Sequence, residues 1–231
     1  YAERFVLPAH EKKKNAVNIL GATPLDFSVN GQVQSIARRL TEGGFSVQSV
    51  WAMGSETAAI DRAGEAEVNL VVSSVGLPAA EFLRERFGMP YVVGAPLGDT
   101  VSALLLGALQ KSIHTGENEI LPAGMPDAPD TVILGESVTS RSLAAALLLD
   151  YGLCAEVICP VELPRELEGS FCRQIEDEQE LQTALSGARR VIADPLFAPI
   201  VPQGAQFFPL PHEAYSGRIY RKQIPNLVTT W

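Results

Sequence analysis

The sequence lacks most of the motifs that mark well-known binding sites. It has only three cysteines and no Cys-x-x-Cys pair, which excludes a disulfide framework and predicts a reduced, cytoplasmic protein. Its most apolar stretch, residues 101–109, is too short to span a bilayer, so no membrane partner is expected. Neither a G-x-G-x-x-G run nor a G-x-x-x-x-G-K-[ST] loop occurs, which disfavours dinucleotide binding.

Basic and aromatic residues are also scarce. Lys and Arg number 18 against 27 Asp and Glu, and the net charge of −9 would repel phosphates, so no nucleic-acid partner is expected. Aromatic residues make up 7% of the chain although hydrophobic residues make up 46%. This composition is typical of parallel sheets covered by closely packed helices. The length of 231 residues suits two domains.

Short apolar strands alternate with helical patterns along most of the chain. The strands are expected at residues 17–20, 45–51, 68–72, 90–93, 132–134, 155–159, 190–193 and 206–209. Helices are expected at residues 29–40, 55–66, 78–87, 100–113, 141–149 and 178–185, with Ser55 capping the second of these. Such alternation requires right-handed crossovers. The sequence therefore predicts an α/β fold of two Rossmann-like domains, with parallel sheets flanked by helices.

The chain divides at a segment rich in proline and acidic residues. We expect a lead-in arm at 1–15, a first Rossmann-like domain at 16–115, a linker at 116–130 and a second Rossmann-like domain at 131–231. The segment Val17–Thr23 resembles Thr131–Ser137, because each is a strand followed by a glycine and a hydroxyl residue. This repeat indicates that the two halves have similar folds.

Glycine and hydroxyl residues at the carboxyl ends of strands are candidate ligand-binding positions. Open parallel sheets bind ligands at this edge, where glycines let the backbone approach and hydroxyls donate. The candidates are Gly21, Thr23, Ser73, Ser74 and Gly98. Ordinary turn chemistry explains the same residues, and near Gly98 we favour N-capping of the next helix by Asp99 or Thr100.

His212 is the candidate metal ligand, because it follows the last expected strand at a sheet's carboxyl edge. A loop histidine can instead simply bond to the backbone. Cys154 and Cys159 fall on one expected strand, five residues apart, and so face opposite sides. Buried, inert thiols are therefore favoured over iron–sulfur ligands for the cysteines.

Several phrases in this order resemble the second and third domains of nitrogenase component 1-type oxidoreductases. The phrases are Asn18–Gly21, Ala66–Ser73, Leu83–Pro90, Pro96–Gly98, Ile192–Pro195, and His212 with Tyr215–Gly217. The family includes molybdenum–iron protein subunits and dark-operative protochlorophyllide reductase subunits, and its domains have the nitrogenase or chelatase-like fold. The likeness extends from about residue 15 to the end of the chain.

The resemblance implies a fragment of a subunit that is inactive alone and acts in electron transfer within an iron–sulfur hetero-oligomer. Its partners would be a paralogous component 1 subunit and an iron-protein reductase. The cysteines for the bridging iron–sulfur cluster would lie in a first domain absent from this sequence. Of the two family ligands to the active-site metallocofactor, His212 matches the histidine, whereas Ala80 occupies the cysteine position and cannot bind metal.

Two other functions compete with this one. A metal or siderophore-binding receptor built from two lobes would use His212 and the crevice loops to hold a small ligand. A two-domain sugar-nucleotide enzyme ranks last, because it needs phosphate-binding glycines and a ribose-binding acid that the sequence does not show.

Overall fold

Two parallel sheets of five strands each form the centre of the protein. The computed structural model describes residues 2–121 and 129–229. The first sheet contains β1 (Ala16–Leu20), β2 (Ser46–Val50), β3 (Val68–Val71), β4 (Tyr91–Val93) and β5 (Glu119–Ile120). The second contains β6 (Thr131–Leu134), β7 (Ala155–Cys159), β8 (Cys172–Gln174), β9 (Arg190–Ala193) and β10 (Gln206–Pro209). Every strand pair is parallel, which confirms the α/β, Rossmann-like prediction.

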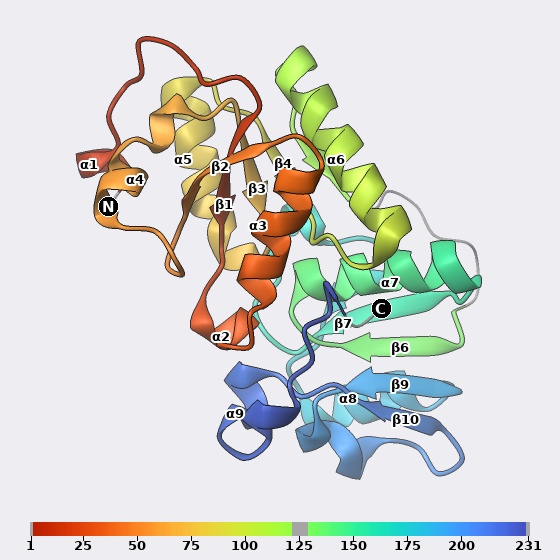
Figure 1. Ribbon diagram of the computed structural model, residues 1–231. Coiled ribbons are helices and arrows are strands. Elements are labelled where there is room, and N and C mark those ends of the chain that lie inside the picture. Colours follow the sequence, from red (N-terminus) through yellow and green to blue (C-terminus); the bar gives the residue numbers. More distant parts are fainter. Residues whose placement is uncertain (1, 122–128, 230–231) are drawn as a thin grey trace.

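Helices cover these sheets (Figure 1). They are α1 (Ala2–Phe5), α2 (Pro24–Phe27), α3 (Gln32–Glu42), α4 (Thr57–Asp61), α5 (Leu77–Phe87), α6 (Gly98–Thr115), α7 (Ser137–Tyr151), α8 (Glu178–Leu185) and α9 (Glu213–Tyr220). Gly88, Gly116 and Gly152 end α5, α6 and α7 in the left-handed conformation that glycine favours. Among the described helices, none combines the length and apolar composition needed to cross a membrane.

The strand order differs between the two halves. The first sheet is ordered β2-β1-β3-β4-β5 and the second β8-β7-β6-β9-β10. Counted from the first strand of each half, these orders are 2-1-3-4-5 and 3-2-1-4-5, the two common doubly wound arrangements. The prediction of similar folds is therefore correct for the architecture but wrong for the connectivity. The repeat between Val17–Thr23 and Thr131–Ser137 reflects only that each segment begins its half.

Two short edge strands were not predicted. β5 lies within residues expected to be linker, and β8 lies in a polar stretch to which no element was assigned. Such strands are held by backbone hydrogen bonds at a sheet edge and need no apolar run, so periodicity does not reveal them. Residues 122–128 of the predicted linker, which include Pro122, Gly124 and Pro126, lie outside the described residues.

The predicted helix caps were wrong because their side chains make tertiary contacts instead. Ser55 Oγ accepts a hydrogen bond from the Val50 N–H at 2.7 Å, and α4 begins two residues later. Asp99 pairs with Arg39 at 3.0 Å, and the Thr100 hydroxyl donates to Asp150. Consequently α6 begins at Gly98 without a side-chain cap.

The two halves are joined by a shared core and by the end of the chain. One buried hydrophobic cluster includes Leu105 of α6 and Leu143 of α7, and the Ala95 N–H donates to Ser142 Oγ at 2.9 Å. After α9 the chain returns to the first half (Figure 1), where Asn30 Nδ2 donates to the carbonyls of Ile224 and Pro225. These contacts fix the carboxyl edges of both sheets along one interface.

Candidate functional site

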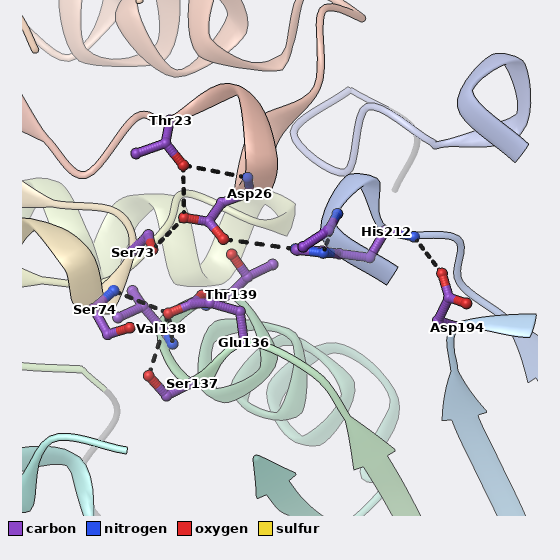
Figure 2. A network of polar contacts seen from close by, with 11 residues as sticks. Thr23, Asp26, Ser73, Ser74, Glu136, Ser137, Val138, Thr139, Asp194 and His212 are labelled. Carbon is purple, nitrogen blue, oxygen red and sulfur yellow. Dashed lines mark hydrogen bonds and ion pairs between the residues drawn. The ribbon is translucent and has the colours of Figure 1, made fainter. Parts of the chain in front are cut away.

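Polar side chains from both sheets converge where the strand order reverses direction. Asp26 follows β1 and Ser73 follows β3, the strands on either side of the reversal in the first sheet. Glu136 follows β6 and Asp194 follows β9, which flank the reversal in the second. Figure 2 shows these residues in one network between the halves. Ligands of doubly wound sheets bind at such points, so the topology identifies this network as the candidate site.

Asp26 is the centre of the network on the first half. Its Oδ2 accepts hydrogen bonds from Thr23 Oγ1 at 2.9 Å and Ser73 Oγ at 2.7 Å. Its Oδ1 faces the second half and lies 3.9 Å from Nε2 of His212 (Figure 2). The two hydroxyl donors therefore fix the carboxylate and leave one oxygen directed between the halves.

Glu136 links the halves at the start of α7. Its carboxylate accepts hydrogen bonds from the N–H groups of Val138 at 3.0 Å and Thr139 at 2.9 Å, which caps the helix. It also accepts from the Ser74 N–H of the first half at 2.9 Å. The side chain is buried, and the helix N-terminus favours its negative charge.

Asp194 fixes the segment that carries His212. This buried carboxylate accepts hydrogen bonds from the His212 N–H at 2.8 Å and from Ser216 Oγ at 2.6 Å. His212 is itself the N-cap of α9, because its Nδ1 accepts from the Ala214 N–H at 3.3 Å. In a neutral imidazole bonded in this way the proton is on Nε2, which faces Asp26. The 3.9 Å separation is too long for a direct hydrogen bond.

Two cavities adjoin the network. A cavity of about 40 Å³, with room for only a few water molecules, is lined by Asp26, Glu136, Asp194, His212 and Tyr215, among others. Burial raises the pKa of Tyr215, and the charges of the surrounding acidic groups raise it further, so this hydroxyl keeps its proton at neutral pH.

The second cavity is an open crevice of about 590 Å³, within the size range of small-molecule sites. Its apolar surface comes from residues that include Leu25, Val75, Leu77 and Val161. Its polar groups are the hydroxyl residues Thr23 and Ser74 and five carboxylates, Asp26, Glu81, Glu136, Glu162 and Glu166. No lysine or arginine is among its described lining residues. The crevice therefore suits a largely apolar molecule better than a phosphate.

The structure brings together four of the six predicted cofactor-binding residues: Thr23, Ser73, Ser74 and His212. Gly21 has φ +82°, and a Cβ there would lie 2.6 Å from the Ser73 carbonyl oxygen, so this glycine allows two turns to pack. Gly98 starts α6 and is absent from the described lining of both cavities. The sequence analysis missed Asp26 and Glu136, although Glu136 directly follows a strand and a glycine.

The cysteines lie differently from the prediction. Cys154 precedes β7 and is partly exposed, whereas Cys159 and Cys172 are buried on neighbouring strands. All three thiols are free. Within residues 2–121 and 129–229, no three His, Cys, Asp or Glu side chains are grouped to hold a metal ion. Iron–sulfur clusters are normally held by four thiolates, so the described residues do not fit such a cluster.

Glu213 provides a second contact between the halves, and its effect should depend on pH. Its carboxylate accepts hydrogen bonds from Arg221 Nε at 2.8 Å and Ser28 Oγ at 2.7 Å, and these bonds lower the pKa of Glu213. Because the pKa of Glu213 is lower in the folded state, its contribution to the free energy of unfolding is fully present above the unfolded-state pKa of about 4.3. This contribution is lost as the pH falls through the folded-state pKa.

We therefore expect Glu213→Gln to reduce the free energy of unfolding more at pH 7 than at pH 3. Urea unfolding of the wild type and the variant at both pH values measures this difference. Glu178→Gln, at an exposed position in the first turn of α8, is the matched control. An equal effect of Glu213→Gln at both pH values would contradict a lowered pKa of Glu213 in the folded protein.

Comparisons with known proteins show the family and the fold of this chain. The sequence profile of the family described as "Nitrogenase component 1 type Oxidoreductase" matches residues 2–136. A subunit of the light-independent protochlorophyllide reductase of Prosthecochloris aestuarii is 35% identical over 97 residues, which cover 42% of this chain and 18% of that protein. The corresponding subunit from Bradyrhizobium sp. is 26% identical over 203 residues, covering 81% and 38%.

A solved structure shares the fold. The protein titled "Nitrogenase Cp1 at pH 5" superposes with a TM-score of 0.60 at 13% identity, covering 92% of this chain and 55% of that chain. This chain thus spans well under half the length of the two protochlorophyllide reductase subunits. The profile match extends over more than half of the chain, through β1 to β6 and up to Glu136. The chain therefore belongs to the nitrogenase component 1-type oxidoreductase family.

Proposed function

We propose that this chain is part of a reductase subunit that works in an iron–sulfur hetero-oligomer, with a paralogous subunit and an iron-protein reductase as partners. The observation that carries the proposal is the convergence of Asp26 and Glu136 on a crevice of small-molecule size at both topological switch points, with His212 lining the small cavity that adjoins it. The names of the relatives, subunits of a protochlorophyllide reductase, favour an organic substrate. The apolar lining of the crevice supports the same choice.

In this proposal the iron–sulfur clusters are held outside the described residues of the chain, because these residues do not fit a cluster. The clusters supply electrons, and this chain positions the substrate and supplies protons. Reduction of an organic molecule consumes a proton for each hydrogen that is not delivered as hydride, so a proton donor beside the crevice is required.

His212 and Asp26 have the geometry for this role. The cap bond to Nδ1 places the imidazole proton on Nε2, between Asp26 and the small cavity. The Asp26 carboxylate, held by two hydroxyl groups, faces this nitrogen from the opposite half. Either role requires the cap bond to be lost, because both the imidazolium and an imidazole bound to metal through Nε2 carry a proton on Nδ1. No three metal-ligating side chains are grouped among the described residues, so we favour a proton donor over the metal ligand expected from the sequence.

The assembly is tested by tagging the chain in its native cells and purifying it without oxygen. We expect a second member of the family to co-purify, together with iron and inorganic sulfide, and visible absorption that decreases on reduction with dithionite. A folded, colourless protein that co-purifies with no family member and contains no iron would overturn the proposal.

The proton-donor role predicts the effect of His212→Asn in that assembly. Asparagine retains an N-cap acceptor for α9 but has no titratable proton. We expect turnover to fall by roughly tenfold or more, with the iron content unchanged. His114→Asn, at an exposed position on α6, is the control. Wild-type turnover and an unchanged pH profile in His212→Asn would rule out the role.

A metal or siderophore receptor is less well supported. Receptors with two lobes usually close on their ligand by hinge motion. Here the shared core, the Ala95–Ser142 hydrogen bond and the returning C-terminal segment hold the halves together. These contacts favour a fixed crevice completed by a partner.

A further inference from the structure

The open crevice between the halves does not enclose a ligand by itself. Three of its apolar lining residues face solvent: Leu25 of α2 is 61% exposed, Val75 after β3 is 59% exposed, and Val161 after β7 is 40% exposed. Sites for small molecules normally bury roughly 70–90% of the ligand surface. A molecule in this crevice would therefore stay in contact with water until another surface covers it.

Three carboxylates on the walls of the same crevice have no cationic partner. Glu81 lies on α5 of the first half, and Glu162 and Glu166 lie between β7 and β8 of the second. Within the described part of the chain, none of the three takes part in an ion pair. Arg165 is exposed and is not among the described lining residues. The crevice mouth thus consists of three exposed apolar residues and three unpaired acids: Leu25, Val75, Val161, Glu81, Glu162 and Glu166.

Two of these acids act on the same point from opposite halves. Burial raises the pKa of Tyr91 in β4, and the charges of Glu81 and Glu166 raise it further. Both carboxylates are therefore close enough to one hydroxyl group to affect it, although each belongs to a different half. Like charges repel at such range, so a cationic group placed between them would be attracted by both.

We infer that the crevice mouth is covered by a segment of the paralogous subunit in which apolar residues stand next to Lys or Arg. The apolar side chains of this segment bury the exposed leucine and valines, and its cations pair with the three acids. A second copy of this chain is disfavoured as the cover, because its net charge of −9 repels an acidic surface. The inference rests on the proposed function, since it specifies the partner that completes the same crevice.

The test on the isolated full chain uses a synthetic amphipathic helix of leucine and lysine as the probe. By fluorescence anisotropy at physiological salt, it should bind more tightly than the same peptide with glutamate in place of every lysine. The triple variant Glu81→Gln, Glu162→Gln, Glu166→Gln should bind the lysine peptide about tenfold more weakly, because three exposed ion pairs are lost.

A matched triple variant changes the net charge equally at exposed positions outside the described lining: Glu42→Gln, Glu178→Gln, Glu180→Gln. Salt screens these distant charges, so binding should weaken by no more than about twofold. Equal weakening in the two triple variants would mean that the peptide senses only the overall charge, and this would overturn the inference. Equal binding of the lysine and glutamate peptides would overturn it as well.

The apolar part of the crevice mouth is tested by Val75→Ser. Because more than half of this side chain is exposed, the variant should fold, and the lysine peptide should bind roughly fivefold more weakly. Ile219→Ser is the control, at a position on α9 that is 78% exposed and outside the described crevice lining. Wild-type affinity in Val75→Ser would show that the apolar residues of the mouth are not covered.

In the hetero-oligomer purified without oxygen, the same three acids should be protected. Carbodiimide with glycinamide converts exposed carboxylates to amides, and the carbodiimide takes up the water that is released. Peptide mass spectrometry should show slower modification of Glu81, Glu162 and Glu166 than in the isolated chain, and equal rates would exclude the cover. If no family member co-purifies, the proposed function fails, whereas the peptide titration of the isolated chain still decides what the mouth binds.

Discussion

Replacing Glu136 with alanine is expected to lower the free energy of unfolding by about 3 kcal/mol. The change removes the cap of α7, whose N–H groups at Val138 and Thr139 lose their acceptor. It also leaves the Ser74 N–H without the carboxylate that it contacts across the halves. A lost cap costs about 1 kcal/mol and a buried unsatisfied donor about 1–3 kcal/mol, so the two effects add.

The matched control is Asp177→Ala. Asp177 caps α8 in the same way, with the N–H groups of Gln179 and Glu180 as donors, but it is exposed and has no described contact across the halves. We expect about 1 kcal/mol for this variant in urea unfolding. Equal losses in the two variants would show that the Glu136–Ser74 contact contributes nothing to stability.

The second large effect is expected for Gly76→Ala. A Cβ at this position would lie 2.7 Å from the Gly21 nitrogen and 2.8 Å from the Leu20 carbonyl carbon, both backbone atoms that cannot rotate away. The turns after β1 and β3 would have to separate, and these turns carry Asp26, Ser73 and Ser74. We expect a loss of roughly 3 kcal/mol, at the upper end of overpacking effects.

Gly107→Ala is the control for Gly76→Ala. Gly107 lies inside α6, is exposed, and has no heavy atom near the added Cβ. Alanine should therefore stabilise the helix by up to about 1 kcal/mol. Thermal unfolding tests both expectations, because the midpoint should fall in Gly76→Ala and rise in Gly107→Ala. A Gly76→Ala midpoint equal to the wild type would mean that the turns are not in close contact.

Glu136→Ala and Gly76→Ala both test how the polar groups of the crevice are held in place. Its polar groups are held in place by contacts that also stabilise the fold, including the Glu136 cap and the close packing of Gly21 and Gly76. Residues fixed in this way lose little entropy when they bind a ligand. We therefore expect mutations at these contacts to weaken ligand binding as well as stability.

Strong local patterns predicted most of the fold. Buried strands such as Val68–Val71 consist of apolar residues, and helices such as α5 and α7 end at glycines that can adopt positive φ. The unpredicted strands β5 and β8 have no such pattern, because backbone bonds to a neighbour are their main support. The helix-cap predictions were wrong for a related reason, because a hydroxyl or carboxylate bonds to whichever partner the tertiary structure brings near.

For this protein, the sequence alone determined the α/β class, the two parallel sheets and the family, because periodicity, terminating glycines and short phrases are local properties. It also located Thr23, Ser73, Ser74 and His212 at strand ends. Only the tertiary structure decided the strand orders, the pairing of Asp26 with His212 and of Glu136 with Ser74, and the meeting of Cys159 with Cys172. Each of these joins residues far apart in the chain or on separate strands, and such proximity arises only when the sheets and their crossovers pack.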